Sequence, residues 1–316
     1  MSQAAASFPP EFRWVSKAAE IAREAGARLR EFLAAGVATE YKGDVDLVTV
    51  ADRTVEKLIR TRIGEAWPDH GIYGEEGTRE GMERQFRWYV DPLDGTTNFA
   101  HGVPQFCVSM GLEERTLAPG AGDDGTLAAA VIYDPMRDEL YCAEKGRGAF
   151  RTGGVPGDGS SSQAWKPMHV SKIPELAESL VATGFPSRKR HDSPNIHFYH
   201  EFTLRSHGVR RAGSAALDLA YVASGRLEAF WEFNLNPWDT AAGILLLQEA
   251  GGRVTDFAGG PFKLDSREVL ASNGLIHDEL VGLFKEMFAG RGLSPIPTPQ
   301  QYAARRAERS GAVAKS

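Results

Sequence analysis

Two aspartates in the stretch WYVDPLDGTTNFAHG are spaced so that their carboxylates could meet in one small volume. Pro92 favours an extended backbone at Asp91, and Gly95 permits a chain reversal that a side chain would hinder. Two carboxylates at close range repel, so one takes up a proton unless a cation lies between them. Because oxygen ligands suit Mg²⁺, the stretch predicts a metal site formed by Asp91, Asp94 and the backbone carbonyl of Leu93.

The residues that follow Asp94 add a second kind of donor. Gly95, Thr96 and Thr97 can present consecutive backbone N–H groups at the start of a short helix, where a phosphate oxygen is well received. The simpler alternative is that both aspartates are turn and cap residues, since Asp is favoured at both kinds of position. The stretch alone leaves the two interpretations open.

The whole sequence has the composition of a globular enzyme. Its 316 residues are 42% hydrophobic and carry a net charge of −6, which argues against a broad electrostatic grip on nucleic acid or an anionic membrane. Cys107 and Cys142 stand in apolar stretches, so we expect buried thiols and a reducing compartment. The amino terminus has no signal-like pattern, and the apolar runs are far shorter than the roughly 18 residues of a membrane span. We therefore expect a cytoplasmic protein.

The apolar pattern predicts one domain over residues 11–290, between a flexible N-terminus at 1–10 and a loose tail at 291–316. Two segments rich in Gly, Ser, Pro and Asp, 118–126 and 153–165, are predicted to be solvent loops. The predicted helices are 11–35, 49–67, 194–207, 214–225, 238–252 and 277–288, and the predicted strands are 71–77, 86–91, 106–114, 127–135, 179–186, 227–233 and 253–257.

Four motifs in order resemble the inositol monophosphatase family of magnesium-dependent, lithium-sensitive phosphatases. They are DLVTVAD at 46–52, GEEG at 74–77, the stretch WYVDPLDGTTNFAHG, and NPWDTAAGILLLQEAGG at 236–252. The resemblance implies an α/β layered sandwich, α/β/α/β/α, which is the fold that inositol monophosphatases share with fructose-1,6-bisphosphatase-like sugar phosphatases. The predicted order of two helices, antiparallel-looking strands and then mixed elements agrees with it. The family is usually dimeric, so a homodimer is expected.

The resemblance also assigns roles to individual residues. The implied ligands of two or three Mg²⁺ ions are Glu75, Asp91, the Leu93 carbonyl, Asp94 and Asp239. Asp52 and Thr96 resemble the catalytic pair that orients the attacking water. The implied substrate contacts are Asp94, Gly95, Thr96, Thr97, Gly213, Ser214, Ala215 and Glu232.

Each of these residues also has an ordinary structural explanation. Glu75 could be a solvated loop acid, Glu232 an acid on a strand face, and Asp239 the cap of the helix that starts there. Asp52 could belong to a helix capping box. His101 stands beside a glycine in a loop and is given no catalytic role.

The activity that follows is hydrolysis of a small phosphate monoester by direct attack of metal-activated water. Myo-inositol monophosphate is favoured, because a carboxylate at Glu232 can accept hydrogen bonds from vicinal hydroxyls. Histidinol phosphate, fructose 1,6-bisphosphate and 3′-phosphoadenosine-type substrates remain open. So does a non-catalytic role as an accessory factor for transcription or ribosomal RNA, although the acidic composition disfavours a nucleic acid partner.

Overall fold

The computed structural model describes residues 12–35, 39–41, 47–117, 125–153, 164–185, 193–304 and 306. The predicted flexible N-terminus lies outside these residues, as do most of the two predicted loops and the end of the predicted tail. None of the helices in the described ranges is long and apolar enough to cross a membrane.

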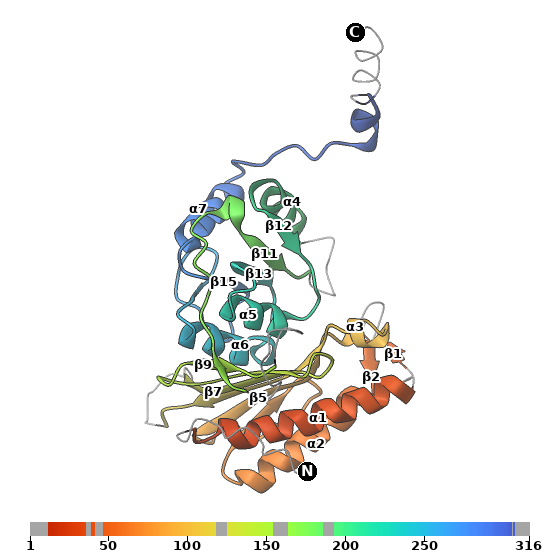
Figure 1. Cartoon of the computed structure of the whole chain (residues 1–316), viewed down its shortest axis with the longest axis vertical. Coiled ribbons are helices and arrows are strands. Elements are labelled where there is room, and N and C mark those ends of the chain that lie inside the picture. The colour runs from red at the N-terminus through yellow and green to blue at the C-terminus, as the bar shows by residue number, and fades with distance from the viewer. Residues whose placement is uncertain are drawn as a thin grey trace.

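Helices and sheets alternate in five layers (Figure 1). A helix pair covers one face of an eight-stranded sheet, a second pair lies between that sheet and a five-stranded sheet, and a third pair covers the far side. The sandwich predicted from the sequence, α/β/α/β/α, is confirmed. The elements are α1 Val15–Ala35, β1 Thr39–Tyr41, β2 Leu47–Thr49, α2 Val50–Ala66, β3 Gly71–Gly74, β4 Arg79–Glu80, β5 Phe86–Asp94, α3 Thr96–Ala100, β6 Cys107–Glu114, β7 Thr126–Asp134, β8 Glu139–Glu144, β9 Ala149–Arg151, β10 Lys166–Pro167, the 3₁₀ helix η1 Leu176–Glu178, β11 Leu180–Thr183, α4 Asn195–Arg205, β12 Gly208–Arg210, α5 Ala215–Ala223, β13 Ala229–Phe233, α6 Pro237–Glu249, β14 Arg253–Thr255, β15 Glu268–Ser272 and α7 His277–Phe288.

The large sheet has the strand order β10-β9-β8-β7-β6-β5-β3-β4. Its pairs are antiparallel as expected, except that β3 and β5 run parallel. The edge strand β4 lies between β3 and β5 in the chain, and it pairs with β3 on the side away from β5. Because β3 and β5 run parallel, their carboxyl ends lie at the same edge of the sheet.

Helices α1 and α2 pack on one face of the large sheet through periodic apolar side chains. In α1, Val15, Ala22 and Leu29 recur every seventh residue and are fully buried, which is the spacing of one helical face.

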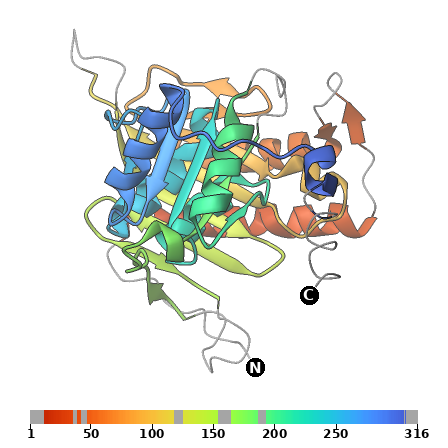
Figure 2. The same cartoon turned by 90° about the horizontal axis from the view of Figure 1, so that it is seen from above.

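Helices α5 and α6 occupy the central layer between the two sheets. Both faces of this layer are covered, so α6 buries an unbroken run from Thr240 to Leu247 instead of a single stripe. In Figure 2, the blue helix α7 and the green helix α4 lie over the strands of the small sheet, whose order is β12-β11-β13-β15-β14. This outer contact is aromatic, and Phe257 stacks on Phe284 with ring centroids 4.2 Å apart.

The segment after α7 leaves the body of the protein (Figure 1). Residues 293–298 form no helix or strand. The start of the segment is fixed, because the backbone N–H and hydroxyl of Ser294 donate to Glu201 on α4. The loose character of the tail as a whole stays a prediction.

His277 gives the fold a pH dependence that can be measured. The side chain is fully buried, with Nδ1 2.8 Å from Ser272 Oγ and Nε2 2.9 Å from Thr255 Oγ1. Burial, with a smaller contribution from the charge of Arg253, lowers the pKa of His277 from its ordinary 6.5 to about 4. Between these values the unfolded chain binds more protons than the folded one, so stability falls as the pH falls.

We expect His277 to make the free energy of unfolding about 2 kcal/mol lower at pH 5 than at pH 7. The substitution His277→Gln should flatten the pH dependence by that amount in urea unfolding curves, whereas exposed His197→Gln should not. An unchanged pH dependence in the His277 variant would contradict this account.

Candidate active site

The chain between Asp91 and Asp94 bulges out of the β5–β6 ladder. Asp91 pairs with Ser109, the register then shifts, and pairing resumes at Asp94 opposite Cys107. Pro92 has no N–H for the ladder, so a bulge is expected here. The Leu93 N–H instead donates to Asp91 Oδ1 at 2.9 Å, which is the turn contact that an aspartate commonly makes.

Gly95 reverses the chain directly after the bulge. Its φ of 99° is in the left-handed region, and a Cβ at this position would lie 2.8 Å from the Gln105 carbonyl oxygen. The reversal predicted at Gly95 is therefore confirmed. Helix α3 starts at the next residue, where the Thr96 hydroxyl donates to the Leu93 carbonyl at 3.0 Å, while Thr97 is exposed.

Asp94 joins the bulge to the beginning of α5, which is about 120 residues away in the chain. Its Oδ2 accepts hydrogen bonds from Ser214 Oγ at 2.6 Å and from the Ala216 N–H at 2.7 Å. Burial raises the pKa of Asp94, although these bonds and one from Ala215 act in the opposite direction. The predicted segment Gly213–Ala215 therefore lies beside Asp94.

Asp239 lies at the beginning of α6 and caps that helix. Its Oδ2 accepts a hydrogen bond from the Asn236 N–H at 2.7 Å, and the Asn236 side chain accepts one from the Asp239 N–H, which completes a capping box. The capping interpretation of Asp239 is thus correct. Burial nevertheless raises the pKa of Asp239 to about 7, and the charge of Asp94 adds to the rise.

Glu75, Asp91, Asp94 and Asp239 are close enough to disturb one another's ionisation. Burial raises the pKa of Asp91 well above its ordinary value, and the charges of Glu75, Asp94 and Asp239 raise it further. Partial desolvation of the carboxylate and then the charge of Asp239 raise the pKa of Glu75 as well. Because the residue as a whole is exposed to solvent, water screens both effects. Asp91 is buried and Asp94 and Asp239 are half-buried, so the group extends from the interior to the surface.

Glu232 reaches the same region from β13. Its pKa is raised by burial and then by the charges of Asp218, Asp239 and Asp94, while Arg211 opposes the rise. The carboxylate lies against Gly184, where an added Cβ would be 2.1 Å from both carboxylate oxygens. The absence of a side chain at residue 184 therefore makes room for Glu232.

Asp52 lies buried in the first turn of α2, and its charge contributes to the raised pKa of Glu75. The capping box predicted as the alternative for Asp52 would pair it with Thr49, whose side chain is outside the described part, so this alternative stays open. The pairing of Asp52 with Thr96 also stays a prediction, since the Thr96 hydroxyl donates to the Leu93 carbonyl.

The donors of this group fit a hard divalent cation, because carboxylates with raised pKa and a backbone carbonyl provide only oxygen. Among the residues that the structure describes, no three His, Cys, Asp or Glu side chains are already gathered tightly enough to hold a metal ion. The side chains would have to converge further to bind one.

Sequence reasoning missed three residues that build the site. Asn98 lies in the first motif, and its Nδ2 donates to the carbonyls of Gln105 at 2.7 Å and Ala212 at 2.9 Å, tying α3 to the segment before α5. Asp218 interrupts the apolar sequence SAALDLAYVA, which was a visible signal. Gly184 gave none, because its importance depends on the distant Glu232.

A five-layered α/β sandwich with carboxylates at the starts of its two central helices is the architecture of the sugar phosphatase fold. Comparison with known proteins makes the assignment specific. A sequence model of the Inositol monophosphatase family matches residues 13–287. This chain belongs to the inositol monophosphatase family.

Three relatives illustrate the range of similar proteins. An inositol-1-monophosphatase of Mesorhizobium japonicum is 41% identical over 252 residues, which are 79% of this chain and 87% of the relative. The Nus factor SuhB of Pseudomonas aeruginosa is 40% identical over 243 residues, 75% of this chain and 82% of the relative. The structure of an inositol monophosphatase from Anabaena (Nostoc) sp. PCC 7120 superposes with a TM-score of 0.72 at 37% identity, covering 90% of this chain and 97% of that one.

The contact of Gly184 with Glu232 gives a test of the substrate side. In Gly184→Ala the new methyl group must displace the Glu232 carboxylate, which is the end of a flexible side chain, so stability should change little. On the prediction that Glu232 accepts one or two hydrogen bonds from a polyol substrate, their loss should raise KM for myo-inositol 1-phosphate about 5- to 20-fold.

Steady-state phosphate release and thermal unfolding measure the two effects separately. Gly64→Ala in α2 is the matched control, because a Cβ there meets no atom within 4 Å. Unaltered KM in Gly184→Ala would show that Glu232 does not contact the substrate.

Proposed function

We propose that this chain hydrolyses myo-inositol monophosphate, or a closely similar small phosphate monoester, to the alcohol and phosphate with the help of Mg²⁺. The observation that carries the proposal is a group of four acids whose ionised forms are destabilised by burial or by neighbouring charges. They are Glu75, Asp91, Asp94 and Asp239. A divalent cation bound among these carboxylates would stabilise their ionised forms. We assign two or three Mg²⁺ ions to these four side chains and the Leu93 carbonyl.

When bound, Mg²⁺ lowers the pKa of water and neutralises charge on the phosphoryl group. The residues of the chain then have separate tasks. We assign Asp52 and Thr96 to orient the attacking water, with the Thr96 hydroxyl fixed by the Leu93 carbonyl. We assign the N–H groups of Gly95, Thr96 and Thr97 to the phosphate oxygens.

Glu232 supports a polyol as the alcohol part of the ester. A half-buried carboxylate can accept hydrogen bonds from two neighbouring hydroxyls. We assign Gly213, Ser214 and Ala215 to contacts with the alcohol part of the substrate as well, because the Ser214 hydroxyl donates a hydrogen bond to Asp94. Histidinol phosphate, fructose 1,6-bisphosphate and 3′-phosphoadenosine-type substrates are the alternatives to be compared in the same assay.

Further properties belong to the same proposal. We expect a lithium-sensitive homodimer without a nucleic acid partner in the catalytic reaction. The thiols of Cys107 and Cys142 are free and buried, which supports the expected cytoplasmic location.

A role as an accessory factor in transcription is the second candidate, because several relatives near 40% identity carry the name Nus factor SuhB. Asp94→Asn separates the two functions. A cellular phenotype that survives this substitution while phosphate release is lost would favour the second candidate.

Asp91→Asn tests the metal group directly. The amide keeps the Oδ1 acceptor for the Leu93 N–H but removes a negative charge from the repelling group. Without Mg²⁺ the variant should therefore be at least as stable as the parent. Millimolar Mg²⁺ should raise the Tm of the parent by several degrees and leave the variant unchanged.

Phosphate release from myo-inositol 1-phosphate should fall more than about 100-fold in Asp91→Asn, and a chelator should abolish it in the parent. The exposed Asp278→Asn is the control and should behave like the parent. Hydrolysis that is equally fast with and without divalent cations would refute the metal assignment.

A further inference from the structure

Glu56 is a buried acid on α2 that the proposed mechanism does not use. Its Oε2 accepts the Glu76 N–H at 2.7 Å, and its Oε1 accepts the hydroxyl and the N–H of Thr78 at 2.6 and 3.1 Å. Hydrogen bonds to a carboxylate are stronger than those between neutral groups. Glu56 therefore binds the turn between β3 and β4, which contains Glu75.

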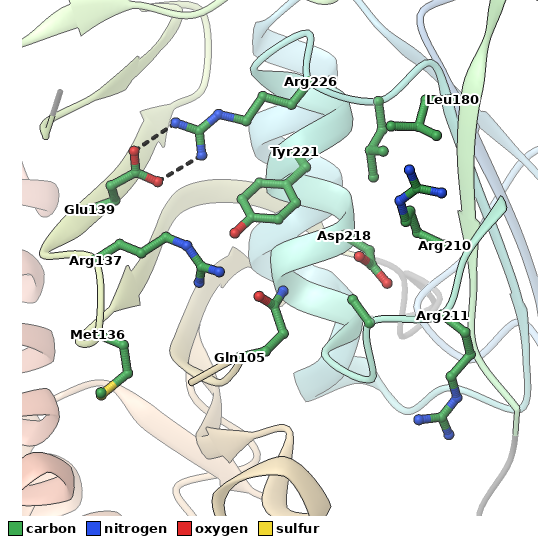
Figure 3. Close-up of a pocket in the computed structure, with 12 residues that line it drawn as sticks. Gln105, Met136, Arg137, Glu139, Leu180, Arg210, Arg211, Asp218, Tyr221 and Arg226 are labelled. Carbon is green, nitrogen blue, oxygen red and sulfur yellow. Dashed lines mark hydrogen bonds and ion pairs between the residues drawn. The ribbon is translucent and has the colours of Figure 1, made fainter. Parts of the chain in front are cut away.

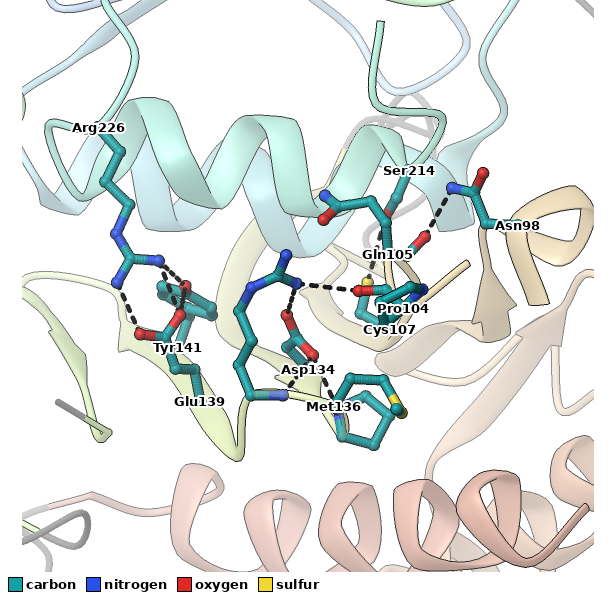
Figure 4. A network of polar contacts seen from close by, with 12 residues as sticks. Asn98, Pro104, Gln105, Cys107, Asp134, Met136, Glu139, Tyr141, Ser214 and Arg226 are labelled. Carbon is teal, nitrogen blue, oxygen red and sulfur yellow. Dashed lines mark hydrogen bonds and ion pairs between the residues drawn. The ribbon is translucent and has the colours of Figure 1, made fainter. Parts of the chain in front are cut away.

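Several other buried acids are balanced by an arginine. Glu139 accepts two hydrogen bonds from Arg226, of 2.6 and 2.7 Å, on the wall of a cavity beside α5 (Figure 3). Asp134, in the polar network of Figure 4, lies 2.7 Å from Arg137. By contrast, Glu56 forms no ion pair with any residue that the structure describes. Its hydrogen bonds to the turn therefore offset the cost of its burial.

The turn is shaped to receive the Glu56 carboxylate. A Cβ at Gly74 would lie 2.4 Å from Glu56 Oε2, so the missing side chain makes room for the acid. The Gly74 N–H donates to the Thr78 carbonyl at 2.9 Å and closes the turn. Arg79 donates to the carbonyls of the same two residues. Two side chains of opposite charge thus hold the backbone of the turn, one through its donors and one through its acceptors.

The position of Glu75 depends on this turn. In the parallel pair of β3 and β5, Gly74 lies opposite Val90, and the Glu75 N–H donates to the Val90 carbonyl at 3.1 Å. Glu75 therefore follows beside Asp91, and the two carboxyl groups are within hydrogen-bond contact. Because Glu75 is exposed, packing restrains it less than it restrains the buried Asp91.

The same helix face also bears Asp52, which we assign to orient the attacking water. Asp52 and Glu56 are four residues apart on α2, and both are buried. Residues at this spacing lie on one side of a helix about one turn apart. One rigid element therefore supports the acid that orients water and the turn that carries Glu75.

We propose that Glu56 is a positioning residue, which holds the turn between β3 and β4 so that the Glu75 carboxylate stays beside Asp91 and binds Mg²⁺. The inference rests on the proposed function, because Glu75 is assigned there as a metal ligand. It extends that assignment to a residue that acts through Glu75 and not on the cation itself.

The test measures the dissociation constant for Mg²⁺ of the full-length protein, from the dependence of Tm on Mg²⁺ concentration. In Glu56→Gln, either orientation of the amide places its NH₂ group against a donor of the turn. The turn should therefore shift, and the dissociation constant should rise about tenfold or more. Glu80→Gln on β4 is the control, because it makes the same change at an exposed side chain that pairs with Arg60. It should bind Mg²⁺ like the parent.

A double variant separates positioning from simple stabilisation of the turn. If Glu56 acts through Glu75, Glu56→Gln should add little to the loss of Mg²⁺ affinity that Glu75→Gln already causes. Two results would overturn the inference alone, namely effects of the two substitutions that multiply in full, or a Glu56→Gln protein that is less stable but binds Mg²⁺ like the parent. If Glu75→Gln also binds Mg²⁺ like the parent, the metal assignment of Glu75 in the proposed function has failed, and the inference falls with it.

Thr78→Val gives a milder check that decides the question even if Glu56→Gln does not fold. It keeps the shape of the side chain and removes the hydroxyl that donates to Glu56, so the dissociation constant for Mg²⁺ should rise about threefold. Thr61→Val is the matched control, because the exposed Thr61 hydroxyl donates to the Lys57 carbonyl within α2. A folded Thr78→Val protein with the dissociation constant of the parent would contradict the inference.

Discussion

Carboxylates that share a poorly hydrated volume repel one another, and this repulsion is the constraint around which the site is built. Asp91, Asp94 and Asp239 come from one strand and one helix, and each has its pKa raised by burial. A fold that gathers such groups loses stability unless something positive lies close by. We infer that a bound cation supplies most of that compensation. Binding of the cation is favourable because it relieves the repulsion between the carboxylates.

The backbone supplies a smaller part of the compensation. The Ala216 N–H at the start of α5 donates to Asp94, and Asp239 lies in the first turn of α6. A helix N-terminus carries a partial positive charge of about half a unit, so both central helices stabilise the acids beside them. The layer architecture makes this possible, because it holds both helices between the sheets with their beginnings near the end of β5.

Much of the fold could be predicted from the sequence for reasons that are local, whereas the roles of Glu75, Asp239 and Glu232 follow from the family resemblance and stay predictions. The apolar periodicity of α1, the proline of the bulge and the glycine at residue 95 act within a few residues. Strand β8 was missed because its two glutamates obscured it. Glu139 is buried against Arg226, and Glu144 accepts the N–H groups of Trp14 and Val15 at the start of α1. The roles of Gly184 and Asp218 could not be predicted either, because they depend on residues far away in the chain.

The central claim is that acids from separate segments form a cation site, and anomalous diffraction from crystals soaked in Mn²⁺ tests it most directly. The account predicts an anomalous peak within about 2.5 Å of carboxylate oxygens of Glu75, Asp91, Asp94 or Asp239, which disappears in Asp91→Asn crystals. Crystals without a peak among these carboxylates, measured at a Mn²⁺ concentration that supports phosphate release, would contradict it.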